Sequence, residues 1–428
     1  MRFGVGLASD PVTILERTLI PFRRGGIVLL LGPSGSGKTT ALSEIARRFP
    51  GGVGVGRMTF PAELAVVDRI APGATLAEAL STLTACGLGE AGLWIRPFES
   101  LSDGEKFRAR LARAIALLSR GGSVGPLLCD EFCTSLHRRI TRAICFNLHK
   151  LAARRNLTIV LACPHDDVIE DLQPRVIVRF HGGGRCTVEQ REVRPRRAVS
   201  FRRRLQIEQG CKKDYESFAA MHYRATDELG FVDKVYVLRD ADELLGIIVY
   251  SHGPLELALR NRATQGWFSH RPDRVNRSLR ILRRLVIHPD IRGCGLGHYL
   301  VRKTMPMLGT RYIECLAGMG EFNPVFEKAG MKRIGQYDVA PRCLEAIRAL
   351  TAIGVDPSAH EFVLHVARRR RVRTIVAGVV EHWYAATTAG AKRRVDHQSP
   401  EFLAQAFRGL IGSRPVYYLW QRKPKKAA

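Results

Sequence analysis

Two kinds of hydrophobic pattern divide the chain. In the first part, the segments 25–32, 124–132 and 157–168 each contain an apolar run of strand length, as in strands that are buried on both faces of a parallel sheet. Between the first and second of these runs, the segment 99–117 has apolar residues at helical spacing. These residues are Phe107, Leu111, Ala114 and Ile115. The alternation of buried strands and amphipathic helices predicts an α/β fold.

After residue 204 the pattern changes to shorter strands and helices. Strands are expected at 205–210, 234–240, 243–251, 281–289, 311–319 and 331–339. Helices are expected at 213–225, 298–308 and 323–330. This mixture predicts an α+β domain.

The C-terminal stretch predicts two helices, at 341–354 and 399–412, and a last strand at 414–424 that completes the preceding sheet, with its aromatic residues in the core. We therefore expect four segments. They are a first domain over 1–190, a basic linker over 191–204, a second domain over 205–345, and an extension over 346–428 that packs on the second domain.

The net charge of the chain says more about its partners than its overall composition does. The chain of 428 residues has a formal net charge of +27, which favours a polyanionic partner such as DNA or RNA. The densest arginine and lysine runs lie at 191–204, 368–373 and 421–426. A solvated basic surface is the alternative for each single run, but the three together favour nucleic acid.

Cysteine usage and hydropathy narrow the setting. The 10 cysteines are scattered without a CxxC pair, which argues against a zinc site or a disulfide framework and for reduced thiols. No apolar run approaches the roughly 18 residues that a bilayer-spanning helix needs. We expect a soluble, cytoplasmic protein with no membrane partner.

A glycine-rich loop follows the first apolar run directly. The sequence GPSGSGKTT begins at Gly32, and a helical pattern continues to 49. Strand, glycine loop and helix in this order predict a P-loop, in which backbone N–H groups surround the phosphates of a nucleotide. Lys38 is expected at the terminal phosphates and Thr39 on Mg²⁺. The expected ATP-binding residues of the loop are Gly32, Gly35, Ser36, Gly37, Lys38, Thr39 and Thr40.

Other positions complete a pattern for ATP hydrolysis. The second apolar run ends in Asp130 and Glu131. The aspartate would hold Mg²⁺ through water, and the glutamate would orient or activate the attacking water. Ser102 and Gly104 stand at the start of a helical segment, where N–H groups are available to an anion. His165 ends the third apolar run, in a position to touch a γ-phosphate.

Residues 25–180 resemble an ABC-type ATPase. By this resemblance, Lys38 and Thr39 belong to the Walker A motif, Asp130 and Glu131 to Walker B, Ser102, Asp103, Gly104 and Glu105 to the signature, and His165 is the switch histidine. Members of this family bind ATP between the Walker A motif of one copy and the signature of another. One cassette in the chain therefore implies a homodimer that forms on ATP.

The chain departs from the family pattern in several places. The signature reads LSDGE rather than LSGGQ, and His137 replaces the usual aspartate after Walker B, so the contacts across the dimer are in doubt. The Q-loop glutamine is missing, and Asp68 is the expected substitute. Only the 63 residues from 39 to 101 separate Lys38 from Ser102, fewer than transporter ATPases use to grip a membrane partner. The pattern favours slow hydrolysis that switches the dimer over transport.

A second glycine loop, RGCGLG, occupies 292–297 between an expected strand and an expected helix. It lacks the Gly-Lys-Thr ending of a P-loop, and it is not the G-x-G-x-x-G of a dinucleotide site. Its N–H groups at a helix N-terminus could hold a pyrophosphate. A purely structural glycine turn is the alternative.

This loop, R-x-x-G-x-G after LVIHPDI, resembles the acetyl-CoA loop of the GNAT acetyltransferases, and the resemblance extends over roughly 203–340. The segment 323–335 is similar to the closing helix and strand of that family. The resemblance implies that Val286 and Ile287 pair with the pantetheine arm of CoA. It also implies that the pyrophosphate is bound by the backbone of Arg292, Gly293, Cys294, Gly295, Leu296 and Gly297. The fold class is then a P-loop ABC-type ATPase domain followed by an α+β GNAT acetyltransferase domain.

The chemistry of the second domain is less determined. Phe326 stands where many GNAT members carry a tyrosine that protonates the leaving thiolate. The candidates for an acid, base or nucleophile are Glu314, Cys315, Glu321, His222 and Tyr223. Each of them could equally be a packing or hydrogen-bonded residue.

The combination resembles ABC-type ATPases fused to a predicted acetyltransferase, with parallels in tRNA cytidine acetyltransferases and phage Mom DNA modifiers. The leading hypothesis is an enzyme that uses ATP, Mg²⁺ and acetyl-CoA to transfer an acyl group to a nucleic-acid base. One alternative is acetylation of a protein or a small amine. Another is a non-enzymatic, ATP-gated nucleic-acid clamp with a vestigial transferase fold.

Overall fold

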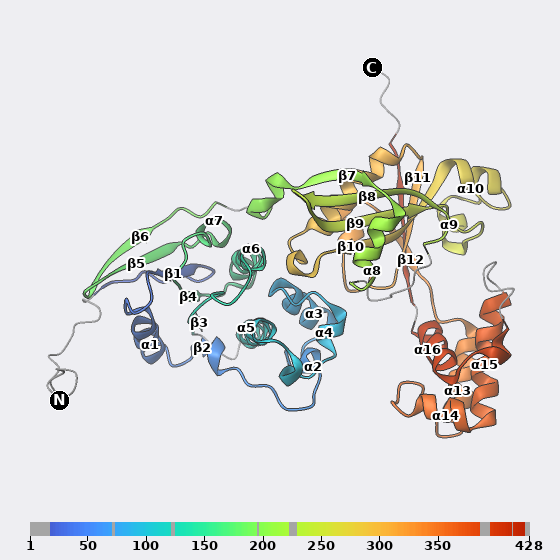
Figure 1. Ribbon diagram of the computed structural model, residues 1–428, viewed down its shortest axis with the longest axis horizontal. Helices are drawn as coiled ribbons and strands as arrows, with labels where there is room; N and C mark the ends of the chain where they lie inside the picture. Colours follow the sequence, from blue (N-terminus) through green and yellow to red (C-terminus); the bar gives the residue numbers. More distant parts are fainter. Residues whose placement is uncertain are drawn as a thin grey trace, which may run out of the picture. The chain divides into compact units, whose positions relative to one another are not determined.

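The computed structural model describes residues 18–70, 73–120, 125–194, 197–221, 229–385, 394–412 and 414–423 (Figure 1). The chain divides into two compact units. The first contains Met1–His252 and Arg280–Thr310, and the second contains Gly253–Leu279 and Arg311–Ala428. This division groups several strands of the expected second domain with the expected ATPase domain.

A six-stranded sheet with the order β2-β3-β4-β1-β5-β6 is central to the first unit. Its strands are β1 (Ile27–Leu31), β2 (Val53–Gly54), β3 (Leu127–Cys129), β4 (Ile159–Cys163), β5 (Val176–Gly182) and β6 (Arg185–Gln190). The neighbours from β2 to β5 are parallel, and β5 and β6 form an antiparallel hairpin. The three apolar runs became β1, β3 and β4, as expected.

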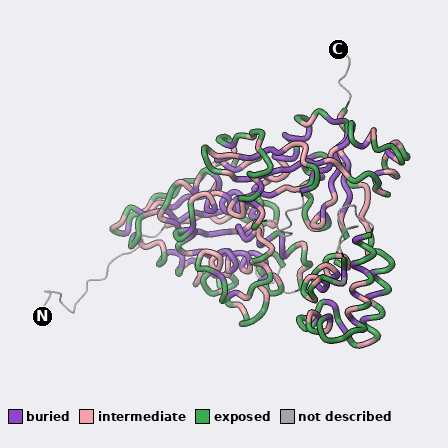
Figure 2. Tube along the Cα trace, turned by 45° about the vertical axis from the view of Figure 1, so that its right-hand side comes forward, coloured by how far each residue is buried: buried purple, intermediate pink, exposed green. Residues whose placement is uncertain are grey.

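Both faces of this sheet are covered, which explains the apolar runs; Figure 2 colours each residue by its burial. Ile27, Leu29 and Leu31 pack into one apolar cluster, whereas Val28 and Leu30 pack into another. The second cluster includes α1, and the first includes α3, α5 and α6. The helices are α1 (Lys38–Arg48), α2 (Val66–Ile70), α3 (Leu76–Ala85), α4 (Ala91–Trp94), α5 (Asp103–Ser119), α6 (Arg138–Arg155) and α7 (Ile169–Leu172).

The first unit also contains an antiparallel run of strands in the order β10-β9-β8-β7. Its elements are β7 (Gln206–Gly210), α8 (Glu216–Ala219), β8 (Val232–Asp240), β9 (Glu243–Ser251), β10 (Leu279–Ile287) and α11 (Leu296–Thr304). The hairpin expected at 234–251 is confirmed. The helix expected at 213–225 is a short 3-10 turn followed by α8, and 222–225 lie outside the described residues.

The second unit holds three antiparallel strands with β13 in the middle. Its smaller elements are α9 (Ala258–Ala263), α10 (Pro272–Ser278), β11 (Tyr312–Ala317), α12 (Val325–Ala329), β12 (Lys332–Gln336) and β13 (Val416–Gln421). The last strand therefore completes a sheet, as expected. Tyr417 and Tyr418 are buried, and Trp420 is half-buried.

Four helices in the second unit form an apolar cluster of their own. They are α13 (Pro341–Thr351), α14 (Phe362–Arg368), α15 (Arg370–Ala385) and α16 (Pro400–Ile411). The sequence predicted α13 and α16 but not α14 and α15, because the basic run at 368–373 separates their apolar positions. In the described parts of the chain, every helix is too short or too polar to cross a membrane.

Candidate nucleotide site and the second glycine loop

The strands β1, β3 and β4 are parallel neighbours, and they end at one edge of the sheet. The register pairs Leu31 with Cys163 and Cys129 with Leu161. The P-loop, the pair Asp130–Glu131, and His165 directly follow these strand ends. Ligands of open α/β sheets bind at the carboxyl ends of the strands. The structure thus brings the expected phosphate, magnesium and water-positioning residues to one edge.

The P-loop has the backbone that its glycines predict. Gly37 is the residue before α1 and has φ 98°, and Gly35 has φ 76°, both in the left-handed region that favours glycine. Lys38 Nζ donates hydrogen bonds to Gly32 O at 2.7 Å and Pro33 O at 2.6 Å. The ammonium group therefore lies over the loop that would surround the phosphates.

Two features of this loop are compatible with bound phosphates. A Cβ atom on Gly35 would have no neighbour within 4 Å, whereas one on Gly32 would approach Phe180 O to 2.8 Å. Ser36 Oγ is buried without a hydrogen-bond partner among the described residues. An unpaired buried hydroxyl is costly unless a ligand supplies a partner. Open space, a spare hydroxyl and a positive charge together suit a polyphosphate.

Glu131 stands in an unusual backbone conformation. Its φ is 47°, which is uncommon for a residue with a side chain. Asp130 Oδ1 accepts a hydrogen bond from Glu131 N at 3.0 Å, and Phe132 N donates to Ala162 O at 2.8 Å. These contacts hold the turn, and the Glu131 side chain is exposed. Strained backbone of this kind is concentrated at functional sites, and here it presents a carboxylate at the strand edge.

The signature segment begins α5. Ser102 and Asp103 are exposed, and Glu105 Oε2 accepts a hydrogen bond from Ser102 N at 2.9 Å. This is one half of a capping box, so Glu105 has a structural role at the position where the family has glutamine. A Cβ on Gly104 would meet Leu136 at 3.0 Å. The exposed helix N-terminus is suited to an anion presented by a second copy.

The departures from the family pattern have structural consequences. His137 precedes α6, and its Nδ1 accepts a hydrogen bond from Arg139 N at 3.4 Å, which is a helix-capping contact. Asp68 is exposed on α2, and among the described residues no hydrogen bond or ion pair joins it to the P-loop. The substitution of Asp68 for the Q-loop ligand stays a prediction.

One connection at this edge was missed by the sequence analysis. Arg138, the first residue of α6, forms an ion pair with Asp167, two residues after His165. The pair ties the segment after Walker B to the segment that carries the switch histidine. The sequence did contain a signal for this ion pair, because the two opposite charges stand close to His137 and His165.

The second glycine loop is packed against helices of its own unit. Arg292 Nη1 donates to Gly89 O at 2.7 Å, Nη2 to Met221 O at 2.8 Å, and Nε to Ile287 O at 2.8 Å. Burial lowers the pKa of Arg292, and Glu90 opposes this shift. The guanidinium group thus serves backbone carbonyls, so its donors are taken up by the fold.

The glycines of this loop allow close packing. Gly293 has φ 84°, and a Cβ there would lie 2.9 Å from Thr84 O and 3.0 Å from Asn147 Nδ2. Cys294 is buried, and its thiol lies 3.9 Å from Ala143 O on α6. Gly295, with φ 82°, precedes α11. This loop has the strand-turn-helix form of a phosphate loop, but α3 and α6 pack against its turn.

Most transferase candidates are occupied by structural contacts. Glu314 has no exposed surface, lies 3.3 Å from Arg260 Nη1, and accepts a hydrogen bond from Tyr417 OH at 2.8 Å. Burial raises the pKa of Glu314 to about 7, against the opposing effects of Arg260 and Tyr417. A carboxyl group enclosed in this way cannot reach a substrate, so its contacts argue for a structural role.

The other candidates differ in their surroundings. Burial raises the pKa of the Cys315 thiol, which suppresses the reactive thiolate. Glu321 is exposed and accepts a hydrogen bond from Gln336 Nε2 at 3.1 Å. Phe326 packs on Tyr418, with ring centroids 5.3 Å apart. His222 and Tyr223 lie outside the described residues.

Comparisons with known proteins bear on the first unit. No family model matches the chain. An aliphatic sulfonates import ATP-binding protein of Nocardia farcinica is 32% identical over 203 residues, which are 43% of this chain and 81% of that protein. A sulfate/thiosulfate import ATP-binding protein of Chromobacterium violaceum is 30% identical over 212 residues, which are 42% of this chain and about half (54%) of that protein. The solved dimeric structure of a bacterial ABC transporter cassette covers 43% of this chain and 93% of its own, with 20% identity and a TM-score of 0.34.

Proposed function

The chain belongs to the ABC-type ATP-binding cassette family, and on this premise we propose that it is an ATP-hydrolysing switch that grips nucleic acid when ATP joins two copies. The observation that carries the ATPase part is the convergence of the P-loop, Asp130–Glu131 and His165 at one sheet edge. Lys38 binds the terminal phosphates, and Thr39 and Asp130 hold Mg²⁺. Glu131 orients the attacking water.

The exposed signature segment of one copy supports dimerisation. The signature at Ser102 and Asp103 is exposed at the start of α5, where the helix dipole favours an anion. A second copy would supply the nucleotide that this helix end receives. ATP would then act as part of the interface, and hydrolysis would open it.

The nucleic-acid part of the proposal is supported by charge. The net charge of +27 on 428 residues is far above what solubility alone requires. Binding that releases counterions from a phosphate backbone gives a log K that falls linearly with log salt concentration. A steep negative slope for oligonucleotide binding supports the proposal, and a flat slope contradicts it.

The dimer is tested separately. The Glu131→Gln protein should sediment as a dimer with ATP and Mg²⁺ and as a monomer with ADP. Lys38→Ala should remain monomeric in both, because it cannot hold the terminal phosphates. A monomer in all four conditions would contradict the switch mechanism but would not contradict nucleotide binding.

Acyl transfer from acetyl-CoA to a nucleic-acid base is a second candidate function. It is favoured by the strand-turn-helix geometry of β10, the RGCGLG loop and α11, beside the antiparallel strands β7–β9. The contacts of Arg292 and Glu314 count against it. Isothermal titration with acetyl-CoA, followed by mass spectrometry of nucleosides, decides it: no heat and unmodified nucleosides would eliminate this candidate.

Coupling to a transporter is a third candidate, favoured because the relatives are import ATP-binding proteins. The 63 residues between Lys38 and Ser102 include most of α1, the short strand β2 and the helices α2, α3 and α4. A membrane partner would be recovered by cross-linking in cell membranes. Recovery of nucleic acid without a membrane protein would favour the switch.

A further inference from the structure

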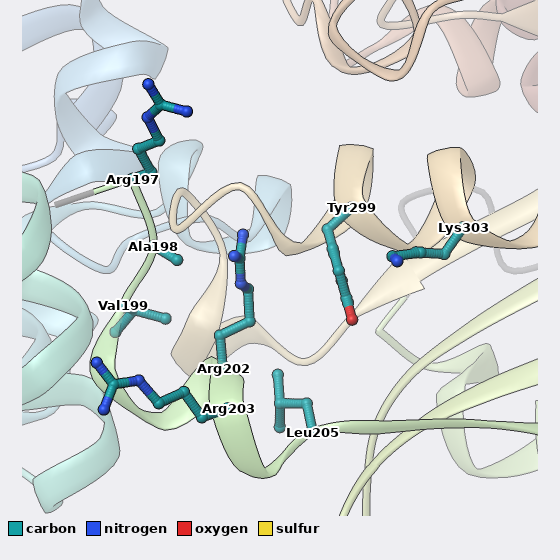
Figure 3. A pocket seen from close by; sticks show the side chains of 8 residues that line it. All are labelled: Arg197, Ala198, Val199, Arg202, Arg203, Leu205, Tyr299 and Lys303. Carbon is teal, nitrogen blue, oxygen red and sulfur yellow. The ribbon is translucent and has the colours of Figure 1, made fainter.

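The segment that the sequence marks as a linker forms one wall of a hollow in the first unit. The hollow has a volume of about 530 Å³, and α11 forms its other wall (Figure 3). Its lining residues are Arg197, Ala198, Val199, Arg202, Arg203, Leu205, Tyr299 and Lys303. A volume of this size suits one nucleotide unit of a larger ligand.

This wall is fixed by the fold. Asp171 is fully buried and accepts hydrogen bonds from both Ser200 N and Ser200 Oγ. Phe201 is buried within a short 3-10 turn, Ser200–Arg204, and Val199 and Leu205 are buried on either side of it. The arginines therefore project from an anchored turn.

The charges in the hollow are of one sign. Four of its lining residues are cations and none is a carboxylate. Among the described residues, none forms an ion pair with Arg197, Arg202, Arg203 or Lys303. Arg203 also lines a neighbouring hollow that contains glutamates, so the other three are the cations committed to this one. Unpaired cations held together repel one another, and a bound anion relieves that cost.

Arg204, on the same turn, is different. It forms an ion pair with Asp240 at 2.9 Å and does not line the hollow. The turn thus separates an arginine that is neutralised by the protein from arginines that are left for a ligand. Arg204 is a matched control for any charge-removal experiment.

The hollow also contains one aromatic ring. The guanidinium carbon of Arg202 lies 5.2 Å from the ring centroid of Tyr299, and the ring stands between Arg202 and Lys303 (Figure 3). An aromatic face flanked by cations is the arrangement by which proteins stack a base and bind the phosphates beside it.

We propose that this hollow binds a single nucleic-acid strand, with a base on Tyr299 and the adjoining phosphates on Arg202, Lys303 and Arg197. The proposal rests on the proposed function and assigns it a site. A duplex keeps its bases stacked inside and presents only phosphates, so it cannot use the ring; a single strand can use both.

The test compares the full-length wild type with the double variant Arg202→Ala/Lys303→Ala and with Arg204→Ala, using a fluorescently labelled oligothymidylate. Removing two phosphate contacts should weaken binding at least about tenfold and make the log K against log salt slope shallower by about 1.4. Arg204→Ala should change neither by more than about twofold, because its charge is already paired. Tyr299→Ala should weaken single-strand binding about tenfold or more through lost stacking, and Tyr299→Phe should retain it.

The outcomes separate the site from the function. If the wild type binds oligothymidylate and the double variant binds it equally well, the site is wrong and the proposed function stands. If the wild type binds no oligonucleotide, the proposed function fails and this site fails with it. If the double variant loses acetyl-CoA binding and keeps oligothymidylate, the hollow serves a soluble nucleotide and the proposal is overturned. Unchanged ATP turnover and melting temperature in all variants check that the fold is intact.

Discussion

Gly37 and Gly295 hold the same place in two similar motifs, each in the left-handed region between a strand and the helix that follows. Around the first motif there is open space at Gly35, and Lys38 lies over the loop. Around the second, Thr84 and Asn147 approach the turn, and helices of the same unit fill the space. A glycine pattern therefore predicts the shape of a turn, while the packing around it decides whether a ligand can enter.

The carboxylates assigned to the two motifs differ in the same way. Glu131 is exposed at the end of β3, on a strained backbone. Glu314 is enclosed between Arg260 and Tyr417. Exposure beside a phosphate loop is what a hydrolytic carboxylate needs, and full burial in a hydrogen-bonded pair is what a structural one has.

The largest expected effect is on ATP turnover, from a substitution in the nucleotide site alone. Glu131→Gln should lower ATP turnover by about 10²–10⁴-fold, because the attacking water loses its general base. Binding of a fluorescent ATP analogue should persist. Phosphate release at saturating ATP measures the change, with Glu314→Gln as the control that should leave turnover unaffected. Turnover within about threefold of wild type would show that Glu131 is not the hydrolytic carboxylate.

Substitution of the cation in each loop should have a different consequence: loss of stability for Arg292 and loss of ATP binding for Lys38. Arg292→Met leaves three backbone carbonyls without their donor and should reduce the free energy of unfolding by about 3 kcal/mol. Lys38→Met should abolish ATP binding. It removes two hydrogen bonds to carbonyls, one of them exposed, so it should lower the free energy of unfolding by only about 1 kcal/mol. Urea unfolding and ATP titration of both variants measure this. An Arg292→Met protein of wild-type stability would contradict the packed-loop interpretation.

Matched glycine substitutions sharpen the contrast. Gly35 and Gly293 have φ of 76° and 84°, so alanine at either costs about 1–2 kcal/mol of backbone strain. Only at Gly293 would the new Cβ also meet a backbone carbonyl, at 2.9 Å. Gly293→Ala should therefore unfold at a lower urea concentration than Gly35→Ala. Equal midpoints would mean that the second turn is as open as the first.

Glu314 supplies a pH dependence. Its pKa is raised from 4.5 to about 7, so the folded state holds a proton that the unfolded state has released between these values. Its contribution to stability is therefore complete below pH 4.5 and lost as pH rises toward 7, at up to about 1.4 kcal/mol per pH unit. Urea unfolding across this range should show the decline in wild type and not in Glu314→Gln. A difference between the two proteins that does not vary with pH would refute the burial effect.

The nucleotide site could be predicted in detail because strand, loop and helix are local in sequence. The P-loop glycines, Lys38, and Asp130 after a buried strand need only the rule that parallel strand ends meet at one edge. The packing of Arg292 on Gly89 could not be predicted, since the two residues are joined by a tertiary contact that no local pattern encodes. The same holds for the Glu314–Arg260 pair: the sequence analysis selected Glu314 as a transferase candidate and gave no sign of its partner Arg260.

The hollow could not be predicted from the sequence for a related reason. Residues 197–205 have the composition of a solvated linker. Two tertiary hydrogen bonds from Ser200 to Asp171, together with the burial of Phe201, make them a wall. Tyr299 and Lys303 are one helical turn apart, which could have been noticed. Their pairing with a segment nearly a hundred positions earlier could not.

The central claim is that ATP controls the grip on nucleic acid, and one measurement tests it directly. Fluorescence anisotropy gives the Kd of the Glu131→Gln protein for labelled oligothymidylate, with ATP and Mg²⁺ or with ADP and Mg²⁺ at the same salt. We predict binding about tenfold tighter with ATP than with ADP, and by linkage the oligonucleotide should raise the affinity for ATP relative to that for ADP by the same factor. Equal Kd values with the two nucleotides would contradict the claim.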